Sequence, residues 1–352
     1  MPRGHRGGGG RDARWKRKAE HMSYTLRDIA SLTGFSKSTI SRVINGDTNV
    51  KDSTREEIME RLAELGYVPN QIAKGLKSEL PLIGVIIQDI RNPYYTQMLY
   101  NFDIITKRHG YTLLYMNSNN DAATERSNIE YLLGMKVKGI IFVASLLDTK
   151  DPIFCQSLKS TNVVTIGYGE NVDTISPNFD RSLRDMLGFL KENGHTELGV
   201  CHDTNLSEPI VKRLAALRSA MGEYGFCLPE RNVYICDDYI EKLDRDYADG
   251  TLPDTIIALT DYVAMQIYDW RDRRGIRIPE QLSVVGCDDI YCSRFLNPPL
   301  STIAQPIERM AEMATNLLLR RIQDHRRHFC SVSVDTEFIQ RRSISQTAQM
   351  GT

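Results

Sequence analysis

The chain has 352 residues, of which 41% are hydrophobic, and its 44 Lys and Arg against 45 Asp and Glu give a net charge of -1. This length leaves room for one small domain and a larger one of two lobes, with enough apolar residues for packed cores. No apolar run is long enough to span a bilayer and no segment has the apolar core of a signal peptide, which excludes those classes and predicts a cytoplasmic protein. The seven cysteines form no CxxC pair, as expected of reduced thiols that serve packing.

Residues 1–22 are the most basic part of the chain, with seven Lys or Arg against two Asp or Glu. They are rich in Gly and Arg and lack apolar periodicity, so we predict a disordered basic extension. Met22 stands directly before the first helical pattern and is a plausible native start. A natural basic arm and an unrelated binding tail are the alternatives.

Two short helices joined by a glycine are predicted next. Thr25 can cap the first helix, because Asp28 follows three residues later and the apolar residues behind it have helical spacing. Gly34 then breaks this helix, and Ser36 can cap a second one over Lys37–Asn45. Two helices joined by such a turn form a helix-turn-helix, which is a DNA-reading architecture.

The outward side chains of the second helix suit the reading of DNA bases. Arg42 can make two hydrogen bonds to guanine, Lys37 can reach guanine or phosphate, and the hydroxyls of Ser38, Thr39 and Ser41 can bond bases or phosphates. A generic three-helix bundle with solvated charges is the alternative, since short helix-turn-helix patterns give false positives. Residues 23–80 carry eight basic and eight acidic side chains, so DNA affinity there must depend on where single charges lie.

A third helix and a much weaker fourth one follow. The third is predicted to start with a capping box, Ser53 with Glu56, and to stop at Gly66. The segment 67–77 is too short to hold a helix alone, and Gly75 weakens it by about 1 kcal/mol relative to alanine. Such a helix should form only against a partner.

These segments closely resemble the lactose-repressor family of bacterial regulators. The matching phrases are Thr25-Leu-Arg-Asp-Ile-Ala, Ser38-Thr-Ile-Ser-Arg-Val-Ile-Asn45 and Tyr67-Val-Pro-Asn with Ala73-Lys-Gly-Leu76. The resemblance implies that residues 69–80 are a hinge helix that folds on operator DNA, with the leucine as an apolar wedge in the minor groove. With the helix pattern, it gives the expected DNA-binding set: Thr25, Ser36, Lys37, Ser38, Thr39, Ser41, Arg42, Asn45, Arg55, Asn70, Ala73 and Leu76.

From Leu82 onward the pattern changes to short apolar runs separated by amphipathic stretches, which is typical of parallel sheets covered on both faces. Two such series in succession predict two α/β lobes, with a ligand cleft at the strand carboxyl ends. The expected strands are Leu82–Ile87, Tyr111–Tyr115, Gly139–Val143, Val163–Ile166, Leu198–Cys201, Val233–Ile235, Thr255–Leu259 and Leu282–Val285.

The resulting fold class is an all-α helix-turn-helix domain plus hinge helix, followed by a two-lobed α/β core with parallel sheets. The expected domains are the helix-turn-helix at 23–68, the hinge and linker at 69–80, the core at 81–345 and a tail at 346–352. Within the core, we place the N-lobe at about 81–168 and 300–329 and the C-lobe at about 169–299 and 330–345.

No pattern for enzyme chemistry is found in the core. Gly167-Tyr-Gly169 follows a strand but does not open a helix. A dinucleotide-binding glycine loop leads from a strand into a helix, so this loop is not expected to bind a dinucleotide. His325 and His328 have helical spacing but stand between arginines, where a solvated helix end is favoured over a metal site. We therefore expect a protein that is not an enzyme and has no metal or cofactor.

The resemblance to the same family extends through this half, in Ile278-Pro-Glu-Gln-Leu-Ser-Val-Val-Gly-Cys-Asp-Asp289 and Pro298-Pro-Leu-Ser-Thr-Ile-Ala-Gln-Pro306 among other phrases. It implies a core like a periplasmic sugar-binding protein, with a small effector held between the lobes. Local matches give the expected effector-binding residues: Asp89, Tyr94, Tyr95, Tyr168, Arg213, Asp261 and Asp288.

Carboxylate and arginine partners for hydroxyls, with an aromatic plane, suit a carbohydrate, and Tyr95 is the favoured stacking face. Asp261 and Asp288 could instead cap helices, and either tyrosine could serve lobe packing. Acidic residues in the C-lobe favour a neutral sugar over a sugar phosphate, while a purine or nucleoside stays open.

The family implies a homodimer that reads two half-sites of a pseudopalindromic operator. The expected function is a repressor of a carbohydrate uptake or catabolic operon, with no membrane partner. A carbohydrate-binding module without operator specificity and a Rossmann-type enzyme are the rivals.

Overall fold

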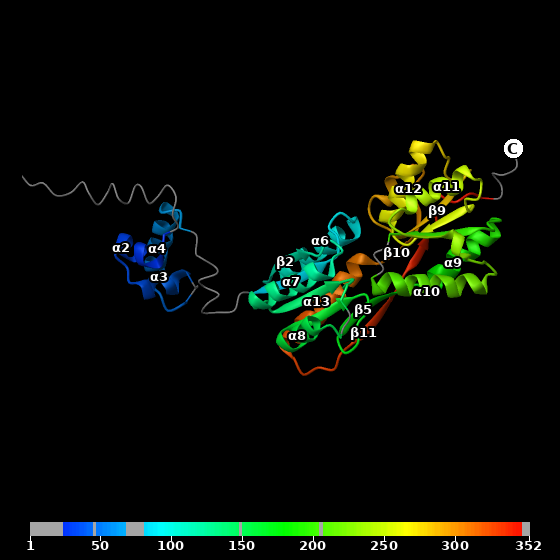
Figure 1. The fold of residues 1–352 in the computed structure, drawn as a ribbon. Helices are drawn as coiled ribbons and strands as arrows, with labels where there is room; N and C mark the ends of the chain where they lie inside the picture. The colour runs from blue at the N-terminus through cyan, green and yellow to red at the C-terminus, as the bar shows by residue number, and fades with distance from the viewer. Residues whose placement is uncertain (1–23, 45–46, 68–80, 148–149, 204–206, 347–352) are drawn as a thin grey trace, which may run out of the picture. The chain divides into compact units, whose positions relative to one another are not determined.

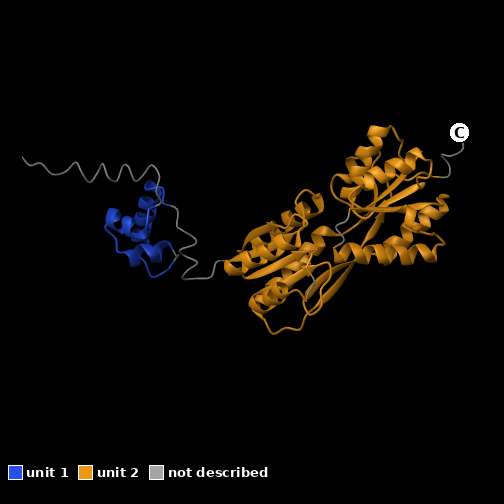
Figure 2. Ribbon diagram, viewed as in Figure 1, with its two compact units in different colours: residues 1–80 blue, residues 81–352 orange. Residues whose placement is uncertain are grey.

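The computed structural model describes residues 24–44, 47–67, 81–147, 150–203 and 207–346. Two compact units divide the chain, residues 1–80 and residues 81–352 (Figure 2). Among the helices of these described segments, none combines the length and apolar content that crossing a membrane would need.

The first unit is built of three helices around one small core. These are α2 (Leu26–Thr33), α3 (Lys37–Ile44) and α4 (Asp52–Glu64). The buried core side chains come from all three: Ile29, Ile40, Val43, Ile58 and Leu62. The helical patterns of the sequence thus place one apolar stripe per helix on a shared core.

The ends of these helices confirm two of the three predicted caps. Thr25 and Asp28 form the capping box of α2, and Gly34 ends it in the left-handed conformation at φ 78°. Ser36 Oγ accepts a hydrogen bond from the Thr39 backbone N–H at 3.1 Å, which caps α3. The capping box at Ser53 was wrong, because α4 already begins at residue 52 and its N-cap, Lys51, makes no side-chain cap bond.

The second unit contains two six-stranded sheets. The first has the strand order β11-β5-β4-β3-β1-β2 and is parallel throughout. Its strands are β1 (Leu82–Ile87), β2 (Thr112–Asn117), β3 (Gly139–Val143), β4 (Asn162–Ile166), β5 (Asp173–Asn178) and β11 (Ser331–Asp335). One face is covered by α6 (Pro93–Arg108) and α13 (Ile307–Gln323), the other by α7 (Ala122–Gly134) and α8 (Pro152–Ser160) (Figure 1).

The second sheet has the order β12-β10-β9-β8-β6-β7, in which only β12 is antiparallel to its neighbour. Its strands are β6 (Leu198–His202), β7 (Val233–Ile235), β8 (Thr255–Ala258), β9 (Ser283–Asp288), β10 (Ser301–Ala304) and β12 (Glu337–Ile339). One face packs on α9 (Asp180–Glu192) and α10 (Glu208–Glu223), the other on α11 (Tyr239–Ala248) and α12 (Asp261–Arg274). Two short 3-10 helices complete the lobe, η1 (Glu230–Asn232) and η2 (Ser293–Phe295).

The chain passes between the two sheets three times: from β5 to α9, from β10 to α13, and from β11 to β12. The expected lobe boundaries were therefore wrong in three places, since β5 and β11 belong to the first sheet and β10 to the second. Strands β5 and β11 mix polar with apolar residues and lack the continuous apolar run that marks a buried strand. Only their pairing shows which sheet they join, because β5 pairs with β4 and β11 pairs with β5.

Candidate functional site

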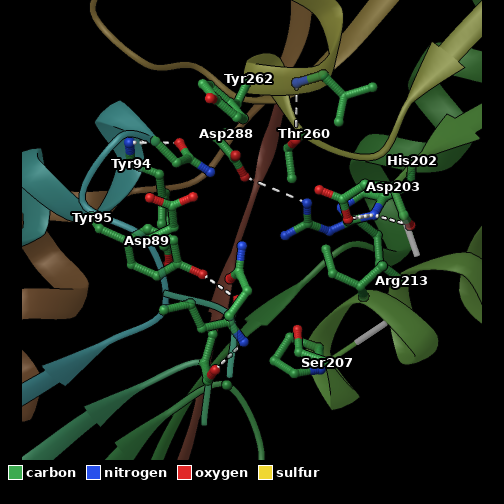
Figure 3. A pocket seen from close by; sticks show the side chains of 18 of the residues that line it. Asp89, Tyr94, Tyr95, His202, Asp203, Ser207, Arg213, Thr260, Tyr262 and Asp288 are labelled. Carbon is green, nitrogen blue, oxygen red and sulfur yellow. Dashed lines mark hydrogen bonds and ion pairs between the residues drawn. The ribbon is translucent and has the colours of Figure 1, made fainter. Parts of the chain in front are cut away.

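A cavity of about 220 Å³ lies between the two lobes, where the carboxyl ends of strands from both sheets meet (Figure 3). Open parallel sheets commonly bind ligands at this edge. The first lobe supplies the residues that follow β1, β3 and β4, and the second supplies those that follow β6, β8 and β9. Among the lining residues are Gln88, Asp89, Ala144, Ile166, His202, Asp203, Thr260 and Asp288.

Arg213 is the buried cation of this cavity. It stands in the first half of α10 and is 6% exposed, with its guanidinium 4.8 Å from the Phe179 ring centroid. Its Nη1 donates to the Leu259 carbonyl oxygen and lies 3.4 Å from Asp288 Oδ1. Its Nε is buried and has no hydrogen-bond partner among the described residues. A donor is therefore left over inside the cavity wall.

Asp288 faces this arginine from the last position of β9 (Figure 3). Burial raises the pKa of its carboxyl group to about 7, against the opposing effect of Arg213. Gln305 Nε2 donates to its Oδ1 at 2.6 Å. The backbone φ of 129° at this residue is rare for a side chain other than glycine, and such strain is found preferentially at ligand sites.

The pKa of Asp89, which follows β1, is shifted in the opposite direction to that of Asp288. Burial alone would raise its pKa, but the Arg91 guanidinium binds both carboxylate oxygens, with Nη2 2.7 Å from Oδ2, and the net pKa is lowered. The two carboxyl groups of the cavity therefore have pKa values shifted in opposite directions, a separation typical of functional sites.

Two of the three predicted aromatic residues reach the cavity. Tyr94 and Tyr95 start α6, are at most 8% exposed and contact each other edge to face, with ring centroids 5.4 Å apart. The Tyr95 hydroxyl donates to Gln88 Oε1 at 2.6 Å, which fixes its ring. The choice of Tyr95 as the stacking face stays a prediction.

Two predicted effector residues do not line this cavity. Tyr168 borders a separate depression, where Lys212 Nζ lies 3.9 Å from its ring centroid. Asp261 is fully buried at the start of α12 and accepts hydrogen bonds from Ile290 N, Ser293 Oγ and Thr302 Oγ1. Its neighbours on either side, Thr260 and Tyr262, line the cavity instead.

Sequence reasoning missed several lining residues, among them Gln88, Arg91, His202, Asp203, Ser207, Thr260, Tyr262 and Gln305. The available signal was position, because most of them lie within a few residues of a strand's carboxyl end. Like Arg213 Nε, the Ser207 Oγ is buried without a hydrogen-bond partner among the described residues.

The candidate DNA-reading surface is the outer face of α3. Lys37, Ser38 and Arg42 are exposed on it, and Thr39 and Ser41 are half-buried. The arginine side chain is 62% exposed, with its Nε 3.9 Å from Asp47 Oδ2. This distant, solvated contact leaves its guanidinium available to a base.

Other predicted DNA-binding residues have structural partners in the first unit. Arg55 Nη2 donates to the Asp47 carbonyl oxygen at 2.5 Å and so fixes the turn after α3. Thr25 is engaged in the capping box of α2, and the hydroxyl of Ser36 lies 2.7 Å from that of Ser38. The hinge helix lies outside the described residues, together with these predicted contacts: Asn45, Asn70, Ala73 and Leu76.

Comparison with known proteins agrees with this layout. The family model of bacterial regulatory proteins of the lacI family matches residues 25–70, and that of the periplasmic binding protein-like domain matches residues 187–344. Catabolite control protein A of Priestia megaterium is 30% identical over 318 residues, which cover 85% of this chain and 92% of that protein.

Two solved structures show the same fold. The Lac repressor dimer bound to operator and the anti-inducer ONPF aligns with a TM-score of 0.78 at 21% identity, covering 92% of this chain and 100% of that one. The complex of the transcriptional regulator CelR with cellobiose gives 0.65 at 24% identity, covering 91% and 99%. The chain therefore belongs to the lacI family of bacterial regulatory proteins and is a DNA-binding transcriptional regulator.

Proposed function

We propose that this protein is a cytoplasmic, dimeric repressor that binds a pseudopalindromic operator and is switched by a neutral sugar held between its lobes. One observation carries the effector part of this proposal: a cavity between the lobes with a buried arginine, two carboxyl groups and hydrogen-bonding atoms without partners among the described residues. The operator part depends on the exposed face of α3.

The unpartnered atoms support a hydroxyl-rich ligand. Arg213 Nε can donate to a ligand oxygen, and Ser207 Oγ can donate or accept. Leaving such a buried group unsatisfied costs about 1–3 kcal/mol, so a ligand that supplies the missing partners gains affinity. Asp288, beside the arginine, and Asp89, on the first lobe, can accept hydrogen bonds from ligand hydroxyls.

Charge and size favour a neutral ring. Each of the two lining arginines already faces a carboxylate, Arg91 with Asp89 and Arg213 with Asp288, so a phosphate group would compete with both. Asp203 adds a further carboxylate to the lining. The cavity of about 220 Å³ lies below the range of about 300–1,000 Å³ usual for larger ligands, and a monosaccharide-sized ring suits it.

Exposed aromatic side chains support the dimer. On the described surface, Tyr100 is 68%, Tyr291 54% and Phe295 76% exposed, and Gln97 Oε1 accepts a hydrogen bond from the Tyr291 backbone N–H at 2.8 Å. This contact joins α6 of the first lobe to the segment after β9 of the second. Large aromatic side chains that are exposed in this way can form an interface between subunits.

The effector is tested by a thermal-shift screen of sugars, sugar phosphates and nucleosides on the full chain. A cognate ligand at about 100 times its dissociation constant should stabilise the protein by about 2.7 kcal/mol. Arg213→Ala should abolish this shift. Arg218→Ala, five residues further along α10 and solvated beside Glu230, should keep it. A nucleoside or sugar phosphate as the only stabilising class would refute the neutral sugar.

The operator is tested by selecting duplexes from a random DNA library with the full chain. We expect enrichment of a sequence with two inverted half-sites. On the selected duplex, Arg42→Ala should lose about 1–3 kcal/mol of binding free energy, because a guanine contact is removed. Arg61→Ala, on α4 and paired with Glu64, is the matched control and should bind normally. Equal binding by both variants contradicts the role of α3.

A further inference from the structure

The amino ends of the first sheet's strands form the end of the first lobe at which the chain enters from residue 80. Pro81 O accepts a hydrogen bond from Thr112 N at 2.8 Å, and Leu82 O accepts one from Lys138 N at 2.8 Å. Lys138 O in turn accepts a bond from Asn162 Nδ2 at 2.6 Å. These contacts link the entry point to the starts of β2, β3 and β4.

The loop 324–330, between α13 and β11, is fixed to the same end. His325 Nδ1 lies 2.8 Å from Asn162 Oδ1. The buried Arg321 forms an ion pair with Asp173 and donates to the carbonyl oxygens of Arg327 and His328, at 3.2 Å each. Figure 1 shows this loop, in orange, on the side of the first lobe away from the second. The loop therefore holds its outward side chains in place.

Six basic side chains are exposed here without an ion pair among the described residues, and we call them the basic end: Arg108, Lys136, Lys159, Arg320, Arg326 and Arg327. Three neighbouring carboxylates offset only part of this charge. Asp103 is paired with Lys107 at 2.7 Å, and Asp324 Oδ1 accepts the backbone N–H of Arg326 at 3.1 Å. The exposed Glu130 lies one turn before the end of α7.

Helix dipoles explain only part of this arrangement. Arg108, Lys159 and Arg320 lie in the last turns of helices, where a positive charge is stabilising in any protein. Lys136, Arg326 and Arg327 lie beyond the helix ends, in loops, where that effect has faded. Their placement on one end needs another reason, and an anionic partner supplies it.

We propose that the basic end binds the phosphate backbone of duplex DNA next to the operator, as a contact independent of base sequence. This inference rests on the proposed function, because it takes an operator-bound first unit as given. Residues 68–80 join that unit to Pro81, and thirteen residues span at most about 45 Å when fully extended. DNA bound by α3 is thus within reach of the basic end, and its phosphates match the charge.

The test compares two duplexes and two double variants of the full chain. One duplex carries only the selected operator, and the other carries about 10 further base pairs on each side, which add phosphates for counterion release. Arg326→Gln with Arg327→Gln removes two charges from the basic end. Arg277→Gln with Arg342→Gln removes two exposed arginines of the second lobe that make no ion pair in the described residues.

The wild type and the control should bind the longer duplex more tightly, with a steeper dependence on salt. The basic-end variant should lose this difference, with affinity for the longer duplex falling at least three- to tenfold and the logarithmic salt slope by up to about 4, because the dimer loses two charges at each of its two basic ends. Its affinity for the short operator should stay unchanged, which also shows an intact fold. Equal binding by both variants on the longer duplex, or equal weakening of the basic-end variant on both duplexes, overturns the proposal. Failure to select any operator refutes the proposed function instead.

Discussion

Asp261 is a carboxylate held entirely by neutral donors. It is fully buried and is surrounded by Ile290 N at 3.0 Å, Ser293 Oγ at 2.5 Å and Thr302 Oγ1 at 2.6 Å. No cation is among its closest contacts in the described residues, and burial raises its pKa to about 6. It ties the start of α12 to the segment after β9 and to β10, and so serves the second lobe rather than the effector.

This environment predicts a pH dependence of stability. Because the folded pKa of about 6 lies above the unfolded value of about 3.9, the folded state holds the proton more tightly, and its stability falls as pH rises through 6. Between pH 5 and pH 8 the wild type should lose about 1.4 kcal/mol more than Asp261→Asn, which has no proton to release. Urea unfolding at both pH values measures the difference. Parallel pH profiles of the two proteins would contradict this account.

At the residue scale, the sequence placed five of seven expected effector residues at the cavity: Asp89, Tyr94, Tyr95, Arg213 and Asp288. For the other two, an adjacent residue lines the cavity instead. Gly167 does so next to Tyr168, and Thr260 and Tyr262 do so on either side of Asp261. The residue types alone do not show which residue of a tight strand-to-helix turn points into a cleft, because the side chains of consecutive residues point in different directions.

At the scale of elements, glycine has opposite roles in β9 and α10. A Cβ on Gly286 would lie 2.0 Å from Asp261 Oδ1 and 2.8 Å from Leu300 Cδ2, so the strand can pass this point only without a side chain. A Cβ on Gly222, near the end of α10, would meet nothing within 4 Å. The same substitution should therefore act in opposite directions.

Gly286→Ala should destabilise the second unit by about 2–4 kcal/mol, because the core around a buried carboxylate would be overpacked. Gly222→Ala should stabilise it by up to about 1 kcal/mol through the loss of backbone entropy in the unfolded chain. Denaturant midpoints of both variants, compared with the wild type, check this. A mild effect of the first substitution would mean that β9 can shift away from α12.

The sequence predicted eight strands with bounds within two residues of those of the structure, except at the end of β9, and all eight are mostly apolar. It missed β5, β10, β11 and β12, which are short or contain polar residues. These four strands lie at or next to the chain's passages between the sheets, and their membership is decided by pairing with distant segments. The local hydrophobic pattern of a strand does not depend on which distant strand it pairs with. The lobe boundaries were misplaced for this reason.

At the scale of the whole molecule, the exposed aromatic surface predicts the assembly state. Phe295→Asp should weaken the proposed dimer at least tenfold, because a charge would be buried at an apolar contact. Tyr131→Asp, which changes an aromatic residue on α7 that is 56% exposed, is the matched control and should leave the dimer intact. Sedimentation velocity over a concentration series measures both. A dimer of unchanged strength in the first variant would place the subunit contact elsewhere.

The three passages of the chain between the sheets also determine how the protein can be made. The first lobe needs α13 to cover one face and β11 to complete its edge, and the second needs β10 and β12. The first lobe cannot close until residue 335 has left the ribosome, and the second cannot close until residue 339 has done so. At about 5–20 residues per second, the roughly 160 residues from β5 to β12 take about 10–30 s to synthesise.

During that interval the nascent chain shows the apolar face that α13 will later cover, and this face is a natural target for a chaperone. The helical unit that precedes it has its whole core within residues 24–67, so it can fold before the rest of the chain is made. A newly made molecule thus has the part that reads DNA long before it has the part that governs it.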